Sequence, residues 1–214
     1  AYAHAARCAM AAGFDGVEVH GANGYLIEQF LRDSINDRSD EWGGPVANRI
    51  RLLVDVMRAV TAETGGGRAG LRLSPITPVN DAAQDSNAAA LYQAAVAALA
   101  PLKLAYLHLI EGQTGGARDL TAKGVAPFDY GALRRLHGGA WMVNNGYDRA
   151  LAIDAVGSGA ADLVAFGKLF ISNPDLGRRL RENAPLNAWD LATFYGGGAK
   201  GYTDYPTLEA AAAT

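Results

Sequence analysis

The stretch Phe14-Asp-Gly-Val-Glu-Val-His-Gly-Ala-Asn-Gly-Tyr25 decides the fold of this chain. It begins with a short apolar run of the kind that forms a buried strand of a parallel sheet. His20, Asn23 and Tyr25 follow directly, and catalytic groups of parallel α/β folds lie where a strand passes into its C-terminal loop. Together these side chains could hold one oxygen and deliver one proton. The alternative is that His20 cross-links the loop while Tyr25 packs in the core.

Further apolar runs of strand length alternate with helical patterns along the chain. Such alternation predicts a parallel sheet with right-handed crossovers. A five-stranded doubly wound sheet would fit the length, but polar or glycine residues end every strand at the same edge, which favours a barrel rim. The expected strands are 16–19, 69–73, 104–110, 141–143 and 163–166. The expected helices are 1–12, a helix from 50 to the glycine cluster at 65–67, 85–99, 129–136, 149–156 and 175–181.

The chain opens in the middle of a helical pattern and offers five strands, whereas a (β/α)8 barrel needs eight strands. We therefore expect an α/β fold in which residues 1–214 form a single domain, the C-terminal part of a TIM barrel. On this interpretation the chain supplies about the last five βα units and the first three strands are absent.

Composition excludes several classes of protein. Half of the 214 residues are hydrophobic and the net charge is −3, which is ordinary for a soluble globular protein. The acidic balance, with no cluster of Lys and Arg, argues against a nucleic-acid-binding surface. Cys8 is the only cysteine, so a disulfide within the chain and a cysteine-based metal site are excluded. With no signal peptide and no apolar stretch near the roughly 18 residues of a membrane span, we expect a cytoplasmic protein without membrane contact.

Two loops are candidates for binding a phosphate. In barrels the loops after the last two strands commonly hold one through backbone N–H groups. Here these loops carry Asn145 and Gly146, and the run from Ala165 to Lys168, in which Lys168 adds a positive charge. The alternative is that the glycines serve only as tight turns.

Arg72 lies inside an otherwise apolar strand. A buried charge without a partner is costly, so Arg72 must meet an anion or an electron-rich ring. A phosphate or a cofactor would supply one. The alternative is an internal salt bridge with Glu18 or Glu111.

These residues belong to a series of ordered motifs that resembles the Old Yellow Enzyme family of ene-reductases. The similarity extends over essentially the whole chain. Its motifs are His20-Gly-Ala-Asn-Gly-Tyr25, Leu31-Arg-Asp, Asn36-Asp-Arg-Ser-Asp-Glu-Trp-Gly-Gly44, Leu71-Arg-Leu-Ser-Pro75, Ala165-Phe-Gly-Lys-Leu-Phe-Ile-Ser-Asn-Pro-Asp-Leu176, Phe194-Tyr-Gly-Gly-Gly and Gly201-Tyr-Thr-Asp-Tyr-Pro-Thr207.

The resemblance implies an FMN-bound barrel that oxidises NADPH or NADH and reduces small activated alkenes such as enones and enals. It makes His20 and Asn23 the pair that holds the substrate carbonyl, Tyr25 the proton donor, and Tyr195 an aromatic residue near the substrate. It assigns the cofactor to Arg72, Asn145, Gly146, Ala165, Phe166, Gly167 and Lys168, without a metal. Lys168 stands where Arg is common, which keeps the charge and loses the bidentate fork.

The resemblance also implies flavin contacts from three earlier strands that have no counterpart here. We expect the missing N-terminal barrel segment to lie elsewhere, for instance in a separate chain. Two other interpretations remain open. One is a phosphate-binding barrel isomerase or lyase without flavin that uses His20 as acid or base, and the other is an inactive fragment that needs its N-terminal complement.

Overall fold

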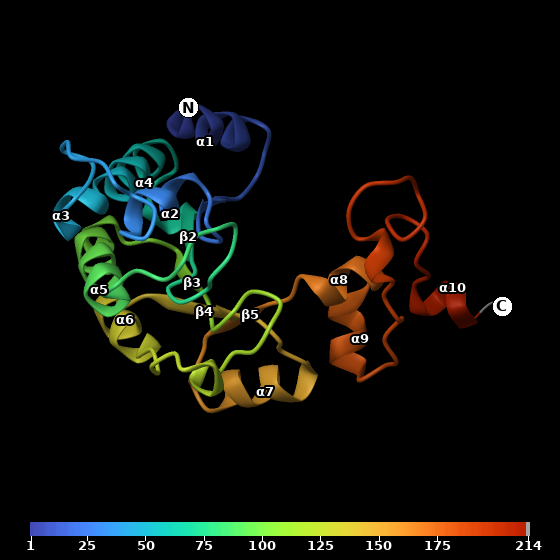
Figure 1. The fold of residues 1–214 in the computed structure, drawn as a ribbon. Coiled ribbons are helices and arrows are strands. Elements are labelled where there is room, and N and C mark those ends of the chain that lie inside the picture. Colours follow the sequence, from blue (N-terminus) through green and yellow to red (C-terminus); the bar gives the residue numbers. More distant parts are fainter. Residues whose placement is uncertain (213–214) are drawn as a thin grey trace.

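The architecture is a five-stranded parallel sheet whose strands follow one another in chain order (Figure 1). The computed structural model describes residues 1–212. All five expected strands are present, as β1 (Val17–Gly21), β2 (Ala69–Leu73), β3 (Tyr106–Ile110), β4 (Ala140–Asn144) and β5 (Leu163–Ala165).

Helices connect these strands and extend the chain beyond β5. The α-helices are α1 (Tyr2–Ala11), α2 (Leu26–Leu31), α3 (Val46–Arg49), α4 (Arg51–Thr64), α5 (Ala88–Leu99), α6 (Tyr130–His137), α7 (Arg149–Gly157), α8 (Lys168–Ser172), α9 (Leu176–Glu182) and α10 (Leu208–Ala212), and short 3-10 helices lie at Gly66–Arg68, Ala100–Leu102, Thr121–Lys123 and Leu191–Thr193. The sequence patterns predicted the six longer helices of this set. They missed α2, α3, α8 and α10, which are too short to show a helical period.

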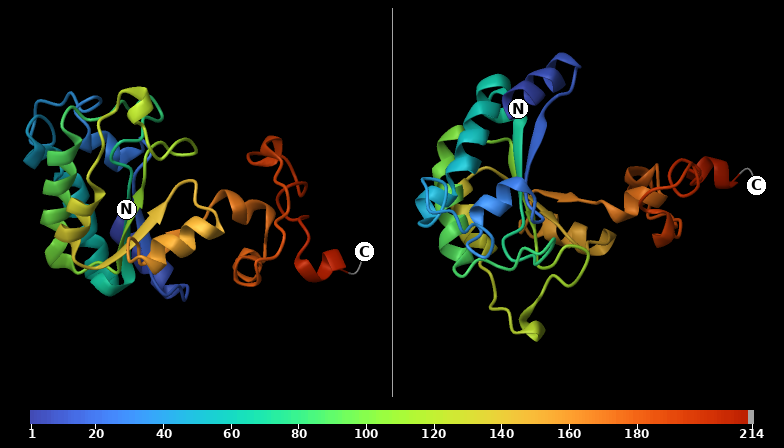
Figure 2. Two further views of the ribbon diagram at one scale, coloured as in Figure 1. Left: turned by 90° about the horizontal axis from the view of Figure 1, so that it is seen from below. Right: turned by 45° about the horizontal axis from the view of Figure 1, so that its top comes forward.

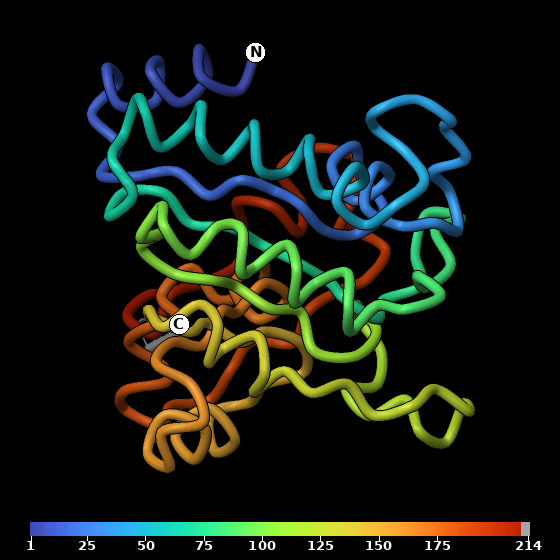
Figure 3. Tube along the Cα trace, turned by 90° about the vertical axis from the view of Figure 1, so that its left-hand side faces the viewer, coloured from blue at the N-terminus to red at the C-terminus, as the bar shows by residue number. Residues whose placement is uncertain are grey.

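One face of the sheet packs against helices. Neighbouring helices α1, α4, α5 and α6 contact one another in that order and lie side by side over this face (Figures 2 and 3). Their apolar residues meet the alternate strand residues that point the same way. The shared core includes Leu53 and Met57 of α4, Leu91 of α5, Leu133 of α6, Leu71 of β2, Leu107 of β3 and Val143 of β4.

The other face of the sheet carries the remaining strand residues, and several of these are polar. Because side chains alternate between the faces of a strand, the register of the sheet places Glu18, His20, Arg72, His108 and Asn144 on one common face. The helix face of the sheet therefore belongs to the hydrophobic core, and the opposite face, called the polar face below, carries polar and ionisable side chains.

No helix within residues 1–212 is long and apolar enough to cross a membrane. The longest, α4, has 14 residues and one apolar side that faces the core.

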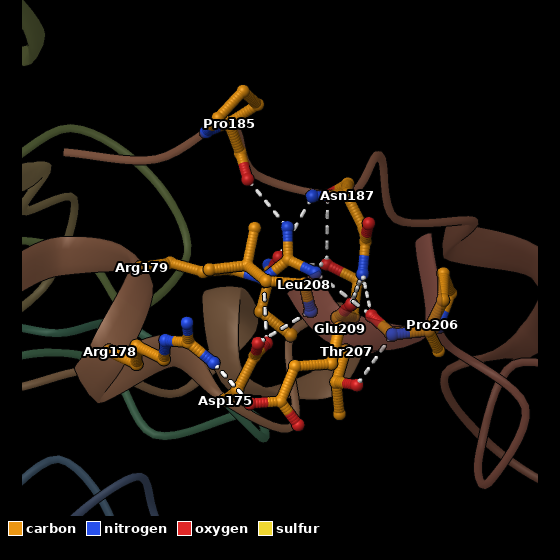
Figure 4. Close-up of polar contacts among 12 residues, drawn as sticks. Asp175, Arg178, Arg179, Pro185, Asn187, Pro206, Thr207, Leu208 and Glu209 are labelled. Carbon is orange, nitrogen blue, oxygen red and sulfur yellow. Dashed lines mark hydrogen bonds and ion pairs between the residues drawn. The ribbon is translucent and has the colours of Figure 1, made fainter. Parts of the chain in front are cut away.

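The segment after β5 extends away from the sheet (Figures 1 and 2). Buried Arg179 of α9 holds this segment together: its Nε donates to Asp175 at 2.6 Å, and its terminal nitrogens donate to the carbonyl oxygens of Pro185 and Pro206 (Figure 4). Asp175 in turn accepts the backbone N–H of Leu208 at 2.8 Å. One guanidinium thus joins α9 to α10 and to the chain between them.

The turn before β2 provides a test of the packing. A Cβ on Gly66 would lie 1.9 Å from the carbonyl oxygen of Leu102, whereas a Cβ on its neighbour Gly67 would meet nothing within 4 Å. We predict that Gly66→Ala lowers the free energy of unfolding by about 1–3 kcal/mol, as overpacking does. Gly67→Ala should change it by less than about 0.5 kcal/mol. Urea unfolding midpoints of both variants check this, and equal values would contradict the predicted close approach.

Candidate active site

The pairing of β1 with β2 brings two of the predicted residues together. His20 and Arg72 are direct register partners in parallel strands, so their side chains leave the sheet on the same face. They lie near the carboxyl ends of their strands, where polar loops begin. Residues 52 positions apart in the sequence thereby share one edge of the sheet.

Asn23 lies in the turn that follows β1, in the left-handed region with φ 59°. Its side-chain oxygen accepts a hydrogen bond from the hydroxyl of Thr114 at 2.7 Å. This contact fixes the orientation of the amide, because the oxygen is already engaged. The Nδ2 group then points away from Thr114, and it donates no hydrogen bond to another group within residues 1–212.

Tyr25 begins α2 as its N-cap residue, and 56% of its surface is exposed. Its ring centroid lies 5.4 Å from that of His20, and the two rings are tilted by 52°. The alternative in which Tyr25 packs in the core is therefore wrong. The phenol, the imidazole and the Asn23 amide belong to one exposed edge.

The pKa of His20 lies below its ordinary value. Burial is the largest cause, the positive charge of Arg72 acts in the same direction, and Glu18 and Glu28 oppose it. This shift favours the neutral form of the imidazole. A neutral imidazole offers one N–H donor and one acceptor nitrogen.

Arg72 has few partners for a half-buried guanidinium. Its Nη2 donates to Asn144 Oδ1 at 3.0 Å, and its Nε is buried without a partner. Burial lowers the pKa of Arg72, although Glu18 opposes this shift. By contrast, the terminal nitrogens of the fully buried Arg32 bond four carbonyl oxygens and pair with a carboxylate, although its Nε also lacks a partner among the described residues.

The salt-bridge partners that the sequence offered for Arg72 are engaged elsewhere. Glu18 pairs with His108, whose Nδ1 lies 2.9 Å from the carboxylate, and Glu111 accepts from Tyr147 at 2.7 Å. The expected alternative for Arg72, an internal salt bridge, is therefore wrong. The side chain of Arg72 leaves the sheet on the same face as that of His20.

Two residues near Arg72 have contacts that the sequence reasoning did not predict, although it counted Asn144 in the first phosphate loop. Asn144 joins Arg72 to β5, because its amide donates to the carbonyl oxygen of Ala165 at 2.7 Å. His108 anchors Glu18 on the same face. Strand alternation could have revealed both, since each occupies a position that points to the face of Arg72.

The two predicted phosphate loops lie at the ends of β4 and β5. Neither Gly146 nor Gly167 has a heavy atom within 4 Å of the place where a Cβ would stand, so their backbone is open to a ligand. The side chain of Asn145 serves the protein itself: it is buried and donates to the carbonyl oxygens of Glu111 and Gln113 at 2.6 and 2.9 Å.

The other predicted residues are placed differently. Ala165 pairs with Asn144 and shares its face, whereas Phe166 lines an apolar cavity of about 500 Å³ between β5, α7 and α9. Lys168 lies with its Nζ 5.1 Å from the ring centroid of Trp189. Tyr195 is 92% exposed in the C-terminal segment, which stands apart from β1, so the structure does not bring it to His20 (Figure 1).

No group of three or more His, Cys, Asp or Glu that could hold a metal ion occurs among the residues that the structure describes.

Comparisons with known proteins place this arrangement in a family. Residues 1–187 match the family described as NADH:flavin oxidoreductase / NADH oxidase. The chain belongs to this family. The resemblance to Old Yellow Enzyme is thereby confirmed, and with it a parallel α/β sheet that forms part of a (β/α)8 barrel.

Individual relatives agree with this assignment. A putative 12-oxophytodienoate reductase 10 from Oryza sativa subsp. japonica is 46% identical over 208 residues, which make up 96% of this chain and 65% of the relative. The 12-oxophytodienoate reductase 1 of the same organism is 46% identical, with 97% of this chain and 54% of the relative covered. The chain therefore spans between about half and two thirds of the length of these relatives.

Solved structures are similar over the same extent. An old yellow enzyme homologue from Zymomonas mobilis has a TM-score of 0.84 and 42% identity, covering 97% of this chain and 57% of that chain. Morphinone reductase in complex with tetrahydroNAD has a TM-score of 0.86 and 38% identity, covering 97% and 54%.

The residues present fit the FMN that the family implies. Arg72 leaves the sheet on the polar face with a buried Nε that has no partner among residues 1–212, and Gly146 and Gly167 leave their backbone open where a side chain would stand. A guanidinium suits an electron-rich ring or an anion, and open backbone N–H groups suit a phosphate. The chain thus has matching groups for both ends of the cofactor.

The electrostatic link between His20 and Arg72 leads to a prediction. Because the positive charge of Arg72 lowers the pKa of His20, Arg72→Gln should raise that pKa toward its ordinary value. Arg118→Gln is a matched control, because Arg118 stacks on Tyr147 and is not among the groups that shift His20. An NMR titration of the imidazole resonances checks both variants. A pKa that stays unchanged or falls in Arg72→Gln would contradict the coupling.

Proposed function

We propose that this chain carries the substrate site of an FMN-dependent alkene reductase that uses NADPH or NADH. The substrates are small α,β-unsaturated carbonyl compounds. The observation that carries the proposal is the gathering of His20, an oriented Asn23 amide and an exposed Tyr25 beside Arg72. That combination provides hydrogen-bond donors, a proton donor and a cationic flavin contact at one edge of the sheet.

His20 and Asn23 are assigned to the carbonyl oxygen of the substrate. When bound, FMN supplies hydride to the alkene carbon β to the carbonyl, after its reduction by the nicotinamide. Negative charge then develops on the carbonyl oxygen, and donors already in position stabilise that charge most in the transition state. Thr114 supports this role by engaging the oxygen of Asn23, which leaves the N–H side for the substrate.

Tyr25 is assigned as the general acid. Its phenol is exposed beside His20, and a phenol within hydrogen-bond range can protonate the α carbon. Arg72 is assigned to the flavin ring, where its charge would stabilise the reduced form. The phosphate is assigned to Gly146, Ala165, Gly167 and Lys168, together with the backbone around Asn145 and Phe166.

We propose further that residues 1–214 form part of one barrel domain and share the flavin with additional barrel strands. These strands belong to the same protein or to a separate chain. The greater length of the relatives supports this, and so does the lack of an outer partner for β1 and β5 within residues 1–212. Edge strands are usually paired or covered.

The experiment that tests the function is an anaerobic visible spectrum of the FMN-loaded protein. Nicotinamide should bleach the flavin absorption, and a subsequent enone should restore it. Bleaching without recovery by any activated alkene would contradict alkene reduction. A protein that binds no FMN, even together with the remaining barrel strands, would favour the flavin-free isomerase or lyase.

Tyr25→Phe tests the proton donor. If the phenol protonates the α carbon, its loss should slow alkene reduction by about a hundredfold or more, the usual contribution of a general acid. Flavin reduction by the nicotinamide should be unaffected, because it needs no such proton. Tyr202→Phe is the matched control, since Tyr202 is 80% exposed in the C-terminal segment. Stopped-flow measurement of both half-reactions checks this prediction. An unchanged rate of enone reduction in Tyr25→Phe would show that Tyr25 is not the proton donor.

A further inference from the structure

A buried carboxylate lies directly beneath the turn that carries Asn23. Glu28 of α2 is fully buried. Its Oε2 accepts the backbone N–H of Gly24 at 2.6 Å, and its Oε1 accepts the hydroxyls of Ser74 and Tyr92 at 2.6 and 2.9 Å. Arg32 pairs with the same carboxylate at 2.9 Å. Within residues 1–212 Glu28 makes no hydrogen bond to His20, Tyr25 or Arg72, and acts on His20 only through its charge, yet through Gly24 it reaches the turn after β1.

Ser74 extends this network to Asn23 itself. Its Oγ accepts the backbone N–H of Asn23 at 2.8 Å while its hydroxyl donates to Glu28. Ser74 follows β2 directly and is fully buried. The hydrogen bonds therefore run from the turn after β1, through the end of β2, to a fixed charge on α2.

The turn has a conformation that needs such support. Asn23 and Gly24 are both in the left-handed region, with φ of 59° and 70°. A side chain at Gly24 would collide with the carbonyl oxygen of Val79, 2.6 Å from its Cβ. In this conformation both backbone N–H groups point inward, to Ser74 and Glu28. With these N–H groups engaged inside the protein, the side chain of Asn23 remains at the exposed edge of the sheet.

The carboxylate is itself immobilised. Arg32, also fully buried, donates to the carbonyl oxygens of Ser74 and Thr77 at 2.7 and 2.8 Å, so the ion pair is held from both sides. A buried ion pair of this kind is sensitive to the removal of either partner and imposes a defined geometry. Burial, and then the charge of Glu28, raise the pKa of the Tyr92 phenol, which stays a hydrogen-bond donor.

We propose that Ser74 and Glu28 are positioning residues that hold Asn23 in place for the carbonyl oxygen of the substrate. They act through the backbone of the turn, without touching the substrate. This inference rests on the proposed function for the identity of the substrate, but the positioning itself can be measured independently of activity.

The chain offers a matched pair of variants. Ser74→Ala and Tyr92→Phe each remove one buried hydroxyl that donates to the same oxygen of Glu28, but only Ser74 also contacts Asn23. A general loss of packing or of carboxylate solvation affects both variants. Loss of positioning affects Ser74→Ala alone.

The experiment measures hydrogen exchange of the Asn23 amide and steady-state enone reduction in the FMN-loaded protein. In Ser74→Ala, exchange at Asn23 should rise about tenfold, the effect of losing one buried hydrogen bond. The enone kcat/KM should fall by a similar factor, and Tyr92→Phe should leave both within about threefold. Equal changes in the two variants, or unchanged exchange in Ser74→Ala, would overturn the proposal.

Two further outcomes keep the test decisive. If Ser74→Ala does not fold, the unmodified protein still decides, because slow exchange at Asn23 and Gly24 is required and rapid exchange at these amides would overturn the proposal. If the unmodified protein reduces no enone, the proposed function fails, while the exchange arm still shows whether Ser74 holds Asn23.

Discussion

The parallel, in-register pairing of β1 with β2 is the constraint on which the rest of the site depends. Side chains alternate along a strand, so a shift of one residue would exchange the two faces. A slip of β1 against β2 would turn Glu18 and His20 toward the helices and bring Val19 to the open face, away from the side chain of Arg72. The hydrophobic helix layer opposes this slip, because Val19 is buried in the core beside Leu71 and the slip would replace it with a charged or polar side chain. Core packing thus determines where the reactive groups point.

Charge is distributed differently on the two sides of this sheet edge. Beneath the turn after β1, the buried pair of Glu28 and Arg32 is fixed by several hydrogen bonds. On the open face, Arg72 makes a single hydrogen bond within residues 1–212, to Asn144; the Nε of both arginines lacks a partner, so the difference lies in their terminal nitrogens. The first arrangement stabilises a conformation, and the second leaves capacity for a ligand. This contrast is the physical basis for assigning structure to one arginine and cofactor binding to the other.

Much of the fold could be predicted from the sequence, because it depends on local patterns. Apolar runs separated by helical periods predicted five strands and their parallel order, and the polar residues after each run predicted the functional edge. His20, Asn23, Tyr25 and Arg72 came from that reasoning. The partners of these residues could not be predicted in the same way. Thr114 reaches Asn23 across 91 positions, and Asn144 reaches Arg72 across 72, and such contacts depend on register and loop conformation.

The central claim is that one edge of this sheet holds both flavin and alkene. A crystal structure of the protein with FMN and an unreactive enone analogue tests it most directly. The account predicts the flavin ring against Arg72, its phosphate at Gly146 and Gly167, and the analogue oxygen within hydrogen-bond distance of His20 and Asn23. Flavin bound away from Arg72, or an analogue oxygen that contacts neither His20 nor Asn23, would contradict it.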